Sequence, residues 1–288
     1  MDSFDKFAEE EYKAYVTYRE LAKVESNSEF RKLLLELSKH ELGHYKFWRK
    51  YSSKKDFSVN PLELLLMKLM RMVFGLTFIA KYMEAAEKNA IKDYTQFMKT
   101  EGKALGKDVK SIINDELYHE NEFSANIKEE RVKFISSMIL GLNDALIEFT
   151  GVLVGLSFAI SNNLFVAVSG LVTGVAATLS MTASAYMQAS YEESKDVTKS
   201  AVYTGLTYMV VVLLLVAPFL LMNTIYASLA VMFGVVFLVT TTVSYYTSVI
   251  FSRSFKQQFG RMLLFSVGVS VVSFALGSIV KALTGISV

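Results

Sequence analysis

The chain contains no cysteine and only two prolines, Pro61 and Pro218. Without cysteine there can be no disulfide and no thiolate metal site, so a bound metal must use carboxylate, imidazole or thioether ligands. Asn-Gly and Asp-Gly pairs, which form tight β-hairpin turns, are also missing. These absences favour an all-α protein.

The net charge is only +2, and no basic run stands out, so a nucleic-acid partner is not indicated. The N-terminus lacks the apolar core of a signal peptide, and we therefore expect the first part of the chain to stay in the cytoplasm. The three histidines and most charges lie before residue 133, whereas the remainder is strongly apolar. This contrast predicts two domains, a charged one over 1–130 and a membrane one over 131–288.

Helical periodicity predicts four helices in the first part: about 2–24, 28–51 with Ser28 as N-cap, a long one opening at Pro61, and about 107–130. On each helix one position of the otherwise apolar stripe is a glutamate. These glutamates are Glu11, Glu41, Glu87 and Glu116. Glu10 is the competing candidate on the first helix, because helix phase is uncertain by a residue.

Two of these glutamates open a Glu-x-x-His pattern that ends at His44 and His119, so glutamate and histidine project from the same face. The two halves also repeat: Tyr18 follows Glu11 by seven residues, as Tyr94 follows Glu87. A single Glu-x-x-His is usually a solvated pair. Two of them, each matched by a core-facing glutamate, predict a carboxylate-bridged dinuclear metal site in a four-helix core. His40 lies off the stripe and is expected to be solvated.

Residues 2–130 therefore resemble the ferritin-like, rubrerythrin-type superfamily. The resemblance implies a four-helix bundle with a di-iron site, manganese or zinc being alternatives, and possible oxidase or peroxidase activity. The implied ligands are Glu11, Glu41, His44, Glu87, Glu116 and His119. Glu84 corresponds to an extra glutamate of rubrerythrins, whereas their cysteine-rich electron-transfer module is missing.

Residues 62–83 are unusually apolar for a soluble helix, although Lys68, Arg71 and Lys81 interrupt them. Two cations in the middle argue against a membrane span. The segment suits either a core helix with a dimer contact or a helix lying on a membrane surface.

Five apolar stretches in the second part are long enough to cross a bilayer: about 134–160, 164–187, 201–222, 225–250 and 262–284. The links 188–200 and 251–261 contain the lysines and arginines, which puts them and the N-terminal domain in the cytoplasm and the C-terminus outside. Glycines in the first two spans predict close helix packing. They are Gly141, Gly151, Gly155, Gly170 and Gly174.

The first span contains two carboxylates, Asp144 and Glu148, one helical turn apart. A charge near the bilayer centre costs roughly 2.5–3.5 kcal/mol, and such residues usually mark ion paths. The alternative is a protonated, hydrogen-bonded structural pair. Met181 in the second span offers a thioether that a transition metal can use. Glu192, Glu193 and Asp196 lie in the next link, either as a metal-collecting mouth or as an ordinary polar loop.

Residues 131–285 resemble the vacuolar iron transporter family through Gly141-x-Asn143-Asp144 and the Ser180-Met181…Tyr186 pattern. The resemblance implies a five-helix dimer that exchanges Fe²⁺ or Mn²⁺ for protons, with Asp144 and Met181 in the path. Many members have Gly-Glu-Tyr where this chain has Ser184-Ala185-Tyr186. Our hypothesis is that Glu148 supplies the missing carboxylate.

The whole chain thus resembles the membrane-bound ferritin type of iron exporter. We predict an integral membrane protein of a prokaryotic cytoplasmic membrane that exports Fe²⁺, or Mn²⁺, in exchange for protons, and whose N-terminal domain binds, senses or oxidises the metal. The alternative is a di-iron oxidase or peroxidase for which the spans are only an anchor.

Overall fold

The computed structural model describes residues 3–54, 56–100, 105–125, 132–160, 162–191 and 196–284. All regular structure in these ranges is helical, which confirms the predicted all-α class. The chain divides into two compact units, Met1–Glu129 and Glu130–Val288. Each unit is described separately below.

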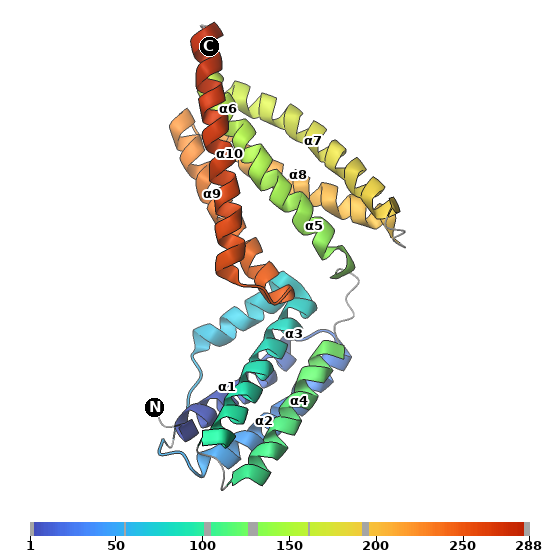
Figure 1. Ribbon diagram of the computed structural model, residues 1–288, viewed down its shortest axis with the longest axis vertical. Coiled ribbons are helices and arrows are strands. Elements are labelled where there is room, and N and C mark those ends of the chain that lie inside the picture. Colours follow the sequence, from blue (N-terminus) through green and yellow to red (C-terminus); the bar gives the residue numbers. More distant parts are fainter. Residues whose placement is uncertain are drawn as a thin grey trace. The chain divides into compact units, whose positions relative to one another are not determined.

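The first unit consists of α1 (Ser3–Val24), α2 (Ser28–Arg49), α3 (Pro61–Thr100) and α4 (Gly106–Ala125). Helix α1 packs along α2, and α3 packs along α4, whereas α1 and α3 touch each other much less (Figure 1). The predicted stripes explain this packing, because the stripe residues of α1, α2, α4 and the part of α3 after Gly75 are mostly buried.

The sequence indicated Ser28 as the N-cap of α2, but the residue that caps this helix is Asn27. The Asn27 side chain accepts hydrogen bonds from the backbone N–H groups of Glu29 and Phe30, each at 3.0 Å. Serine and asparagine are about equally good N-caps, so their order in the sequence could not decide between them.

Helix α3 is broken at Gly75, where the backbone adopts φ 86° and ψ 178°. This region is accessible essentially to glycine alone. The preceding 61–74 segment is attached to α1 by Lys68–Glu20 at 2.9 Å and to the link after α1 by Arg71–Glu25 at 2.6 Å. The sequence predicted one continuous helix here, because an isolated glycine can also be tolerated inside a helix.

Aromatic side chains fill the core of the first unit around Trp48, which is fully buried. Its ring stacks on Tyr94 with centroids 5.4 Å apart and an interplanar angle of 16°. Phe7 contacts both rings, and Phe97 meets Trp48 edge-on. Such pairs add roughly 0.5–1.5 kcal/mol beyond area burial and fix the spacing of the helices around them.

Within its described residues, the second unit contains five helices long and apolar enough to cross a membrane, as predicted. The first span is made of α5 (Val132–Asp144), a π-helical turn η2 (Ala145–Phe149) and α6 (Thr150–Ile160). The others are α7 (Asn163–Tyr191), α8 (Val197–Leu221), α9 (Ile225–Ile250) and α10 (Phe255–Thr284). Helix α10 begins before the predicted residue 262, because its polar first turns contain no proline to stop the helix.

Glycines bring the spans of the second unit close together. A Cβ on Gly141 would lie 2.9 Å from the Thr204 carbonyl oxygen of α8. A Cβ on Gly277 of α10 would lie 2.4 Å from the Gly155 carbonyl oxygen of α6. These contacts place the first span between α8 and α10 and fix the position of its carboxylates.

Replacing Gly75 by alanine tests the break in α3. The backbone there is unfavourable for any residue with a Cβ, so we expect Gly75→Ala to destabilise the first unit by about 1–3 kcal/mol. Trp48 is the only tryptophan, so its fluorescence during urea titration of the full-length protein reports this unit alone.

Gly43→Ala is the matched control. Gly43 lies within α2, and nothing lies within 4 Å of a Cβ built there. Alanine should therefore stabilise the unit by about 0.5–1 kcal/mol through helix propensity. Equal effects of the two variants would contradict the proposed role of Gly75.

Candidate metal centre

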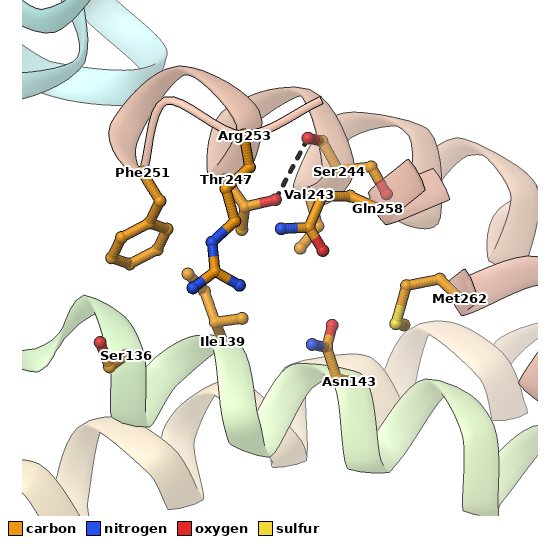
Figure 2. Close-up of a pocket in the computed structure, with 10 residues that line it drawn as sticks. All are labelled: Ser136, Ile139, Asn143, Val243, Ser244, Thr247, Phe251, Arg253, Gln258 and Met262. Carbon is orange, nitrogen blue, oxygen red and sulfur yellow. Dashed lines mark hydrogen bonds between the residues drawn. The ribbon is translucent and has the colours of Figure 1, made fainter. Parts of the chain in front are cut away.

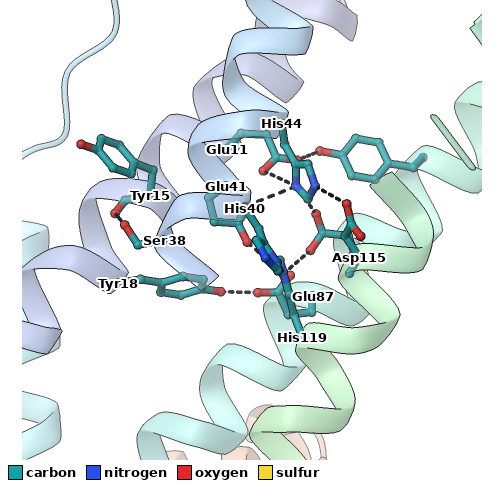
Figure 3. Close-up of polar contacts among 12 residues, drawn as sticks. Glu11, Tyr15, Tyr18, Ser38, His40, Glu41, His44, Glu87, Asp115 and His119 are labelled. Carbon is teal, nitrogen blue, oxygen red and sulfur yellow. Dashed lines mark hydrogen bonds and ion pairs between the residues drawn. The ribbon is translucent and has the colours of Figure 1, made fainter. Parts of the chain in front are cut away.

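Six polar side chains converge in the middle of the first unit (Figure 3). Each comes from a position where a glutamate or histidine replaces an apolar residue of a helix stripe, and each is buried. They are Glu11 of α1, Glu41 and His44 of α2, Glu87 of α3, and Glu116 and His119 of α4. The structure thus brings together the four predicted glutamates and both predicted histidines.

The six residues form two overlapping groups that could each hold a metal ion. One group is Glu11, Glu41, His44 and Glu116, and the other is Glu41, Glu87, Glu116 and His119; within each, the potential ligand atoms lie within 4.8 Å of one another. Glu41 and Glu116 belong to both groups. Two shared carboxylates suit two adjacent cations, because each carboxylate has two oxygens that accept at the same time.

Several buried atoms of the cluster have no hydrogen bond with adequate geometry. Oε1 of Glu116 lies 3.0 Å from Nδ1 of His44, and Oε1 of Glu41 lies 3.0 Å from Nδ1 of His119. Nevertheless both oxygens, and Nδ1 of His44, remain unsatisfied. Buried polar groups are nearly always paired, and oxygen and imidazole ligands of this kind suit a divalent transition metal, so the residues present fit a metal site.

Mutual repulsion and burial set the protonation of the metal-free cluster. Burial and the neighbouring carboxylates of Glu116 and Glu11 raise the pKa of Glu41 well above its ordinary value. Burial and Glu41 do the same to the pKa of Glu87. Burial lowers the pKa of His44, but the surrounding carboxylates outweigh it, so the net pKa is raised.

Glu116 behaves in the opposite way. Burial raises its pKa, but the hydrogen bond with His119 and the close approach of the His44 ring lower it more, so the net pKa lies below the ordinary value. The two shared carboxylates thus shift in opposite directions, Glu116 toward its ionised form and Glu41 toward its protonated form.

Two tyrosines connect the helices in a crossed manner. Tyr18 of α1 donates a hydrogen bond to Glu87 of α3, and Tyr94 of α3 donates one to Glu11 of α1. The matched seven-residue spacing in the sequence therefore corresponds to a pair of reciprocal contacts. Each tyrosine fixes the carboxylate of the other half of the domain.

Two further residues orient the histidines from outside the cluster. Nε2 of His44 lies 3.2 Å from Asp115 Oδ2, and Nε2 of His119 lies 3.0 Å from Nδ1 of His40. Each Nδ1 then points toward the carboxylates. Such outer partners fix the ring orientation of metal-ligating histidines. His40 was predicted to be solvated, and this was wrong, because its partner is on another helix.

These outer partners share a sequence position that could have identified them. His40 directly precedes Glu41, and Asp115 directly precedes Glu116. Each contacts the histidine of the other Glu-x-x-His pattern. The arrangement is crossed in the same way as that of the tyrosines.

The two remaining candidates of the first unit lie outside the cluster. Glu10 is exposed and lies 3.7 Å from Lys6, so Glu11 is the α1 residue that joins the cluster. Glu84 forms ion pairs of 2.6 Å with both Lys81 and Lys88. Burial raises the pKa of Glu84, but the two lysines lower it more and leave a net decrease.

The predicted carboxylates of the first span lie at its π-helical turn. Asp144 ends α5 and is half-buried, whereas Glu148 lies within η2 and is exposed on the single chain. The buried Tyr208 of α8 donates a hydrogen bond of 3.3 Å to Glu148 Oε2. Single π turns inside α-helices are frequent at functional sites, and the sequence pattern did not predict this one.

A polar cavity of about 290 Å³ lies beside Asn143, the residue before Asp144 (Figure 2). Ser244, Arg253 and Gln258 are among its other lining residues. Oδ1 of Asn143 and Oγ of Ser244 are buried without a hydrogen-bond partner. Such groups are usually satisfied by water, so this cavity is suited to hold water beside Asn143; neither Asp144 nor Glu148 lines it.

The other predicted residues of the second unit lie on α7 and in the link before α8. Met181 of α7 is half-buried and packs against the apolar core of the unit. Asp196 precedes α8 and lies 3.5 Å from Lys199. Glu192 and Glu193 lie outside the described residues.

Comparison with known proteins gives one match. A model of the VIT family, the vacuolar iron transporter family, matches residues 135–195, from the first span to just beyond α7. No curated protein and no solved structure matches the chain. The matched residues and the five apolar helices fit an integral membrane metal transporter, whereas the match does not extend to the first unit.

Metal binding should release protons. The raised pKa values of Glu41, Glu87 and His44 favour the protonated form of each group in the metal-free cluster. A divalent cation displaces these protons, so affinity should fall on acidification from about pH 8 to about pH 6, with about one to two protons released per ion. Calorimetric titration of Mn²⁺ in buffers of different ionisation enthalpy measures this release.

Glu84→Gln is the control for proton release. Its lowered pKa means that Glu84 is already ionised at neutral pH, so the variant should release as many protons as the wild type. Affinity that does not change with pH would contradict the protonation described above.

Proposed function

We propose that the protein transports a divalent transition metal, Fe²⁺ or Mn²⁺, out of the cytoplasm. In this proposal the six-residue cluster of the first unit binds the ion, and the second unit moves it across the membrane. The observation that supports transport most directly is the pair Asp144 and Glu148 inside a candidate membrane span. Intramembrane carboxylates are expensive, and they usually lie on ion or proton paths.

The first unit would be a ferritin-like bundle with a dinuclear iron site. Two groups of potential ligands that share Glu41 and Glu116 support two ions held side by side. Iron bound there would supply redox chemistry, whereas the protein groups would bind the ions and exchange protons with them. Binding would concentrate, sense or oxidise the metal.

Proton coupling follows from competition for the same oxygens. A metal ion and a proton bind carboxylate oxygens in turn, so protonation of Asp144 and Glu148 from the outer side would release the ion. We place the N-terminal unit in the cytoplasm and the C-terminus outside. The distribution of lysine and arginine between the links supports this orientation.

A homodimer would complete the membrane site. Glu148 is exposed on the single chain, and a carboxylate facing lipid is costly. A second copy that covers this face would put two such carboxylates near one path. Glu148 would also replace the glutamate that is missing from Ser184-Ala185-Tyr186, with Met181 as a thioether contact and Glu192, Glu193 and Asp196 collecting ions at the cytoplasmic mouth.

The second candidate function is a membrane-anchored di-iron oxidase or peroxidase. Tyrosines hydrogen-bonded to the cluster at Glu11 and Glu87 favour it, because they can supply protons and electrons next to bound iron. In that case the spans would only anchor the enzyme.

Asp144→Asn tests the transport proposal. The amide cannot release a proton or neutralise a cation, so Fe²⁺ flux into proteoliposomes, followed with an encapsulated metal-sensitive dye under a pH gradient, should fall at least about tenfold. The metal content of the first unit should stay unchanged. Asp108→Asn changes an exposed aspartate of α4 and should transport normally.

If the Asp144→Asn variant transports Fe²⁺ at the wild-type rate, the proposed role of this carboxylate in transport is rejected. No flux in the wild type, together with Fe²⁺-dependent oxygen or peroxide consumption, would instead favour the anchored enzyme.

Glu41→Ala tests the shared ligand. Because Glu41 belongs to both groups of potential ligands, its loss should remove both metal ions, whereas Glu84→Gln should retain them. Elemental analysis of full-length protein after desalting gives the metal-to-protein ratio, and far-ultraviolet circular dichroism checks that the variants are folded. Retention of two ions by Glu41→Ala would exclude the bridging role.

A further inference from the structure

A cavity of about 570 Å³ lies between α1, α3 and the 61–74 segment of the first unit. Its walls include Ala14, Ala86 and Ala90, whose short side chains leave the space between α1 and α3 open. This explains why these two helices touch so little, although each packs closely on its own partner.

The inner end of the cavity is the metal cluster. All four cluster glutamates line it, whereas neither His44 nor His119 does. The cavity therefore reaches the cluster from its carboxylate side. Glu41 and Glu116, which each have an oxygen without a hydrogen bond, are among these lining residues, so a cation arriving through the cavity would meet carboxylates whose bonding capacity the protein leaves incomplete.

The outer wall is formed by the 61–74 segment. Glu63, Met67 and Met70 line the cavity, and their spacing of four and three residues puts them on one face of the helix. The break at Gly75 lets this face lie over the space beside α1. Met83 adds a third sulfur from the main part of α3.

The mouth is acidic but partly neutralised. Glu10, Glu63 and Asp93 line it, together with Lys13. Lys13 pairs with Glu63, and Lys6 lies 2.5 Å from Asp93. The carboxylates are thus held by mobile lysine ammonium groups, which a divalent cation can displace without leaving a buried charge unpaired.

We propose that this cavity is the route by which a divalent transition-metal ion reaches the cluster, and that Glu63, Met67 and Met70 contact the ion on the way. The inference rests on the proposal that the cluster binds metal. Carboxylates at the mouth attract any divalent cation. The thioethers inside favour transition metals over Mg²⁺ and Ca²⁺, and favour softer ions over Mn²⁺.

Loading kinetics of the full-length protein in nanodiscs test the route. Anaerobic Co²⁺ and Mn²⁺ are mixed with metal-free protein, and a fluorescent chelator reports the free ion over time, while elemental analysis gives the final ratio. Ala90→Phe should obstruct the cavity and slow the loading of both ions by about tenfold or more, and Glu63→Gln should reduce the salt dependence of the rate. The final ratio should stay at two ions per chain.

The double variant Met67→Leu, Met70→Leu keeps the side-chain volume and removes the sulfur. The loading of Co²⁺ should become slower than in the wild type by a larger factor than the loading of Mn²⁺. A purely structural effect would slow both ions equally. Met98→Leu and Glu36→Gln change residues outside the cavity and should load at the wild-type rate.

Two results would overturn the inference in different ways. Wild-type loading rates in Ala90→Phe and in the double methionine variant, with two ions bound at the end, would reject the route and leave the metal site intact. A wild-type protein that binds no metal would reject the cluster proposal and the route with it.

Discussion

The first unit depends on one constraint: four carboxylates lie within a single apolar helical core. Four charges at this separation cannot all stay ionised without compensation. In the metal-free protein, protons and two imidazoles provide that compensation, as the opposite pKa shifts of Glu41 and Glu116 indicate. In the membrane unit, the carboxylates of Asp144 and Glu148 also lie within an apolar helix. Within a single chain, Tyr208 donates a hydrogen bond to Glu148. In both places a visiting cation would remove the cost of burial, and this common logic connects the two halves of the proposal.

Around the cluster, the contacts that fix each ligand come from the opposite half of the domain. Tyr18 of α1 contacts Glu87 of α3, and Tyr94 of α3 contacts Glu11 of α1. In the same way, His40 of α2 contacts the histidine of α4, and Asp115 of α4 contacts the histidine of α2. The geometry of one ligand set therefore depends on helices that belong to the other. The cavity follows from this arrangement, because α1 and α3 are joined by long tyrosine side chains and not by close packing of their backbones.

The scarcity of proline and the missing hairpin turns predicted the all-helical class, and the length of the apolar stretches predicted the five spans. Periodicity predicted the glutamates that interrupt apolar stripes, because it shows which face of a helix is buried. It could not distinguish Glu10 from Glu11 by itself; the packing of α1 decides that. The break at Gly75 and the π turn at Glu148 escaped prediction, because a glycine or a carboxylate in a helical pattern is compatible with an unbroken helix. His40 and Asp115 were missed for another reason: their partners are about 70 to 80 residues away, and only the assembled core brings them into contact.

The crossed contacts have a consequence for how such a domain can arise. One helix pair with one copy of the pattern would contain a glutamate, a Glu-x-x-His and a tyrosine, but each would lack the group that orients it. Only a second copy, facing the first about a twofold axis, supplies those groups. A self-associating helical hairpin would thus already have the full constellation. Gene duplication followed by fusion would join the two copies covalently and let each copy diverge. Such divergence is visible at the position before each Glu-x-x-His pattern, which is His40 in one copy and Asp115 in the other.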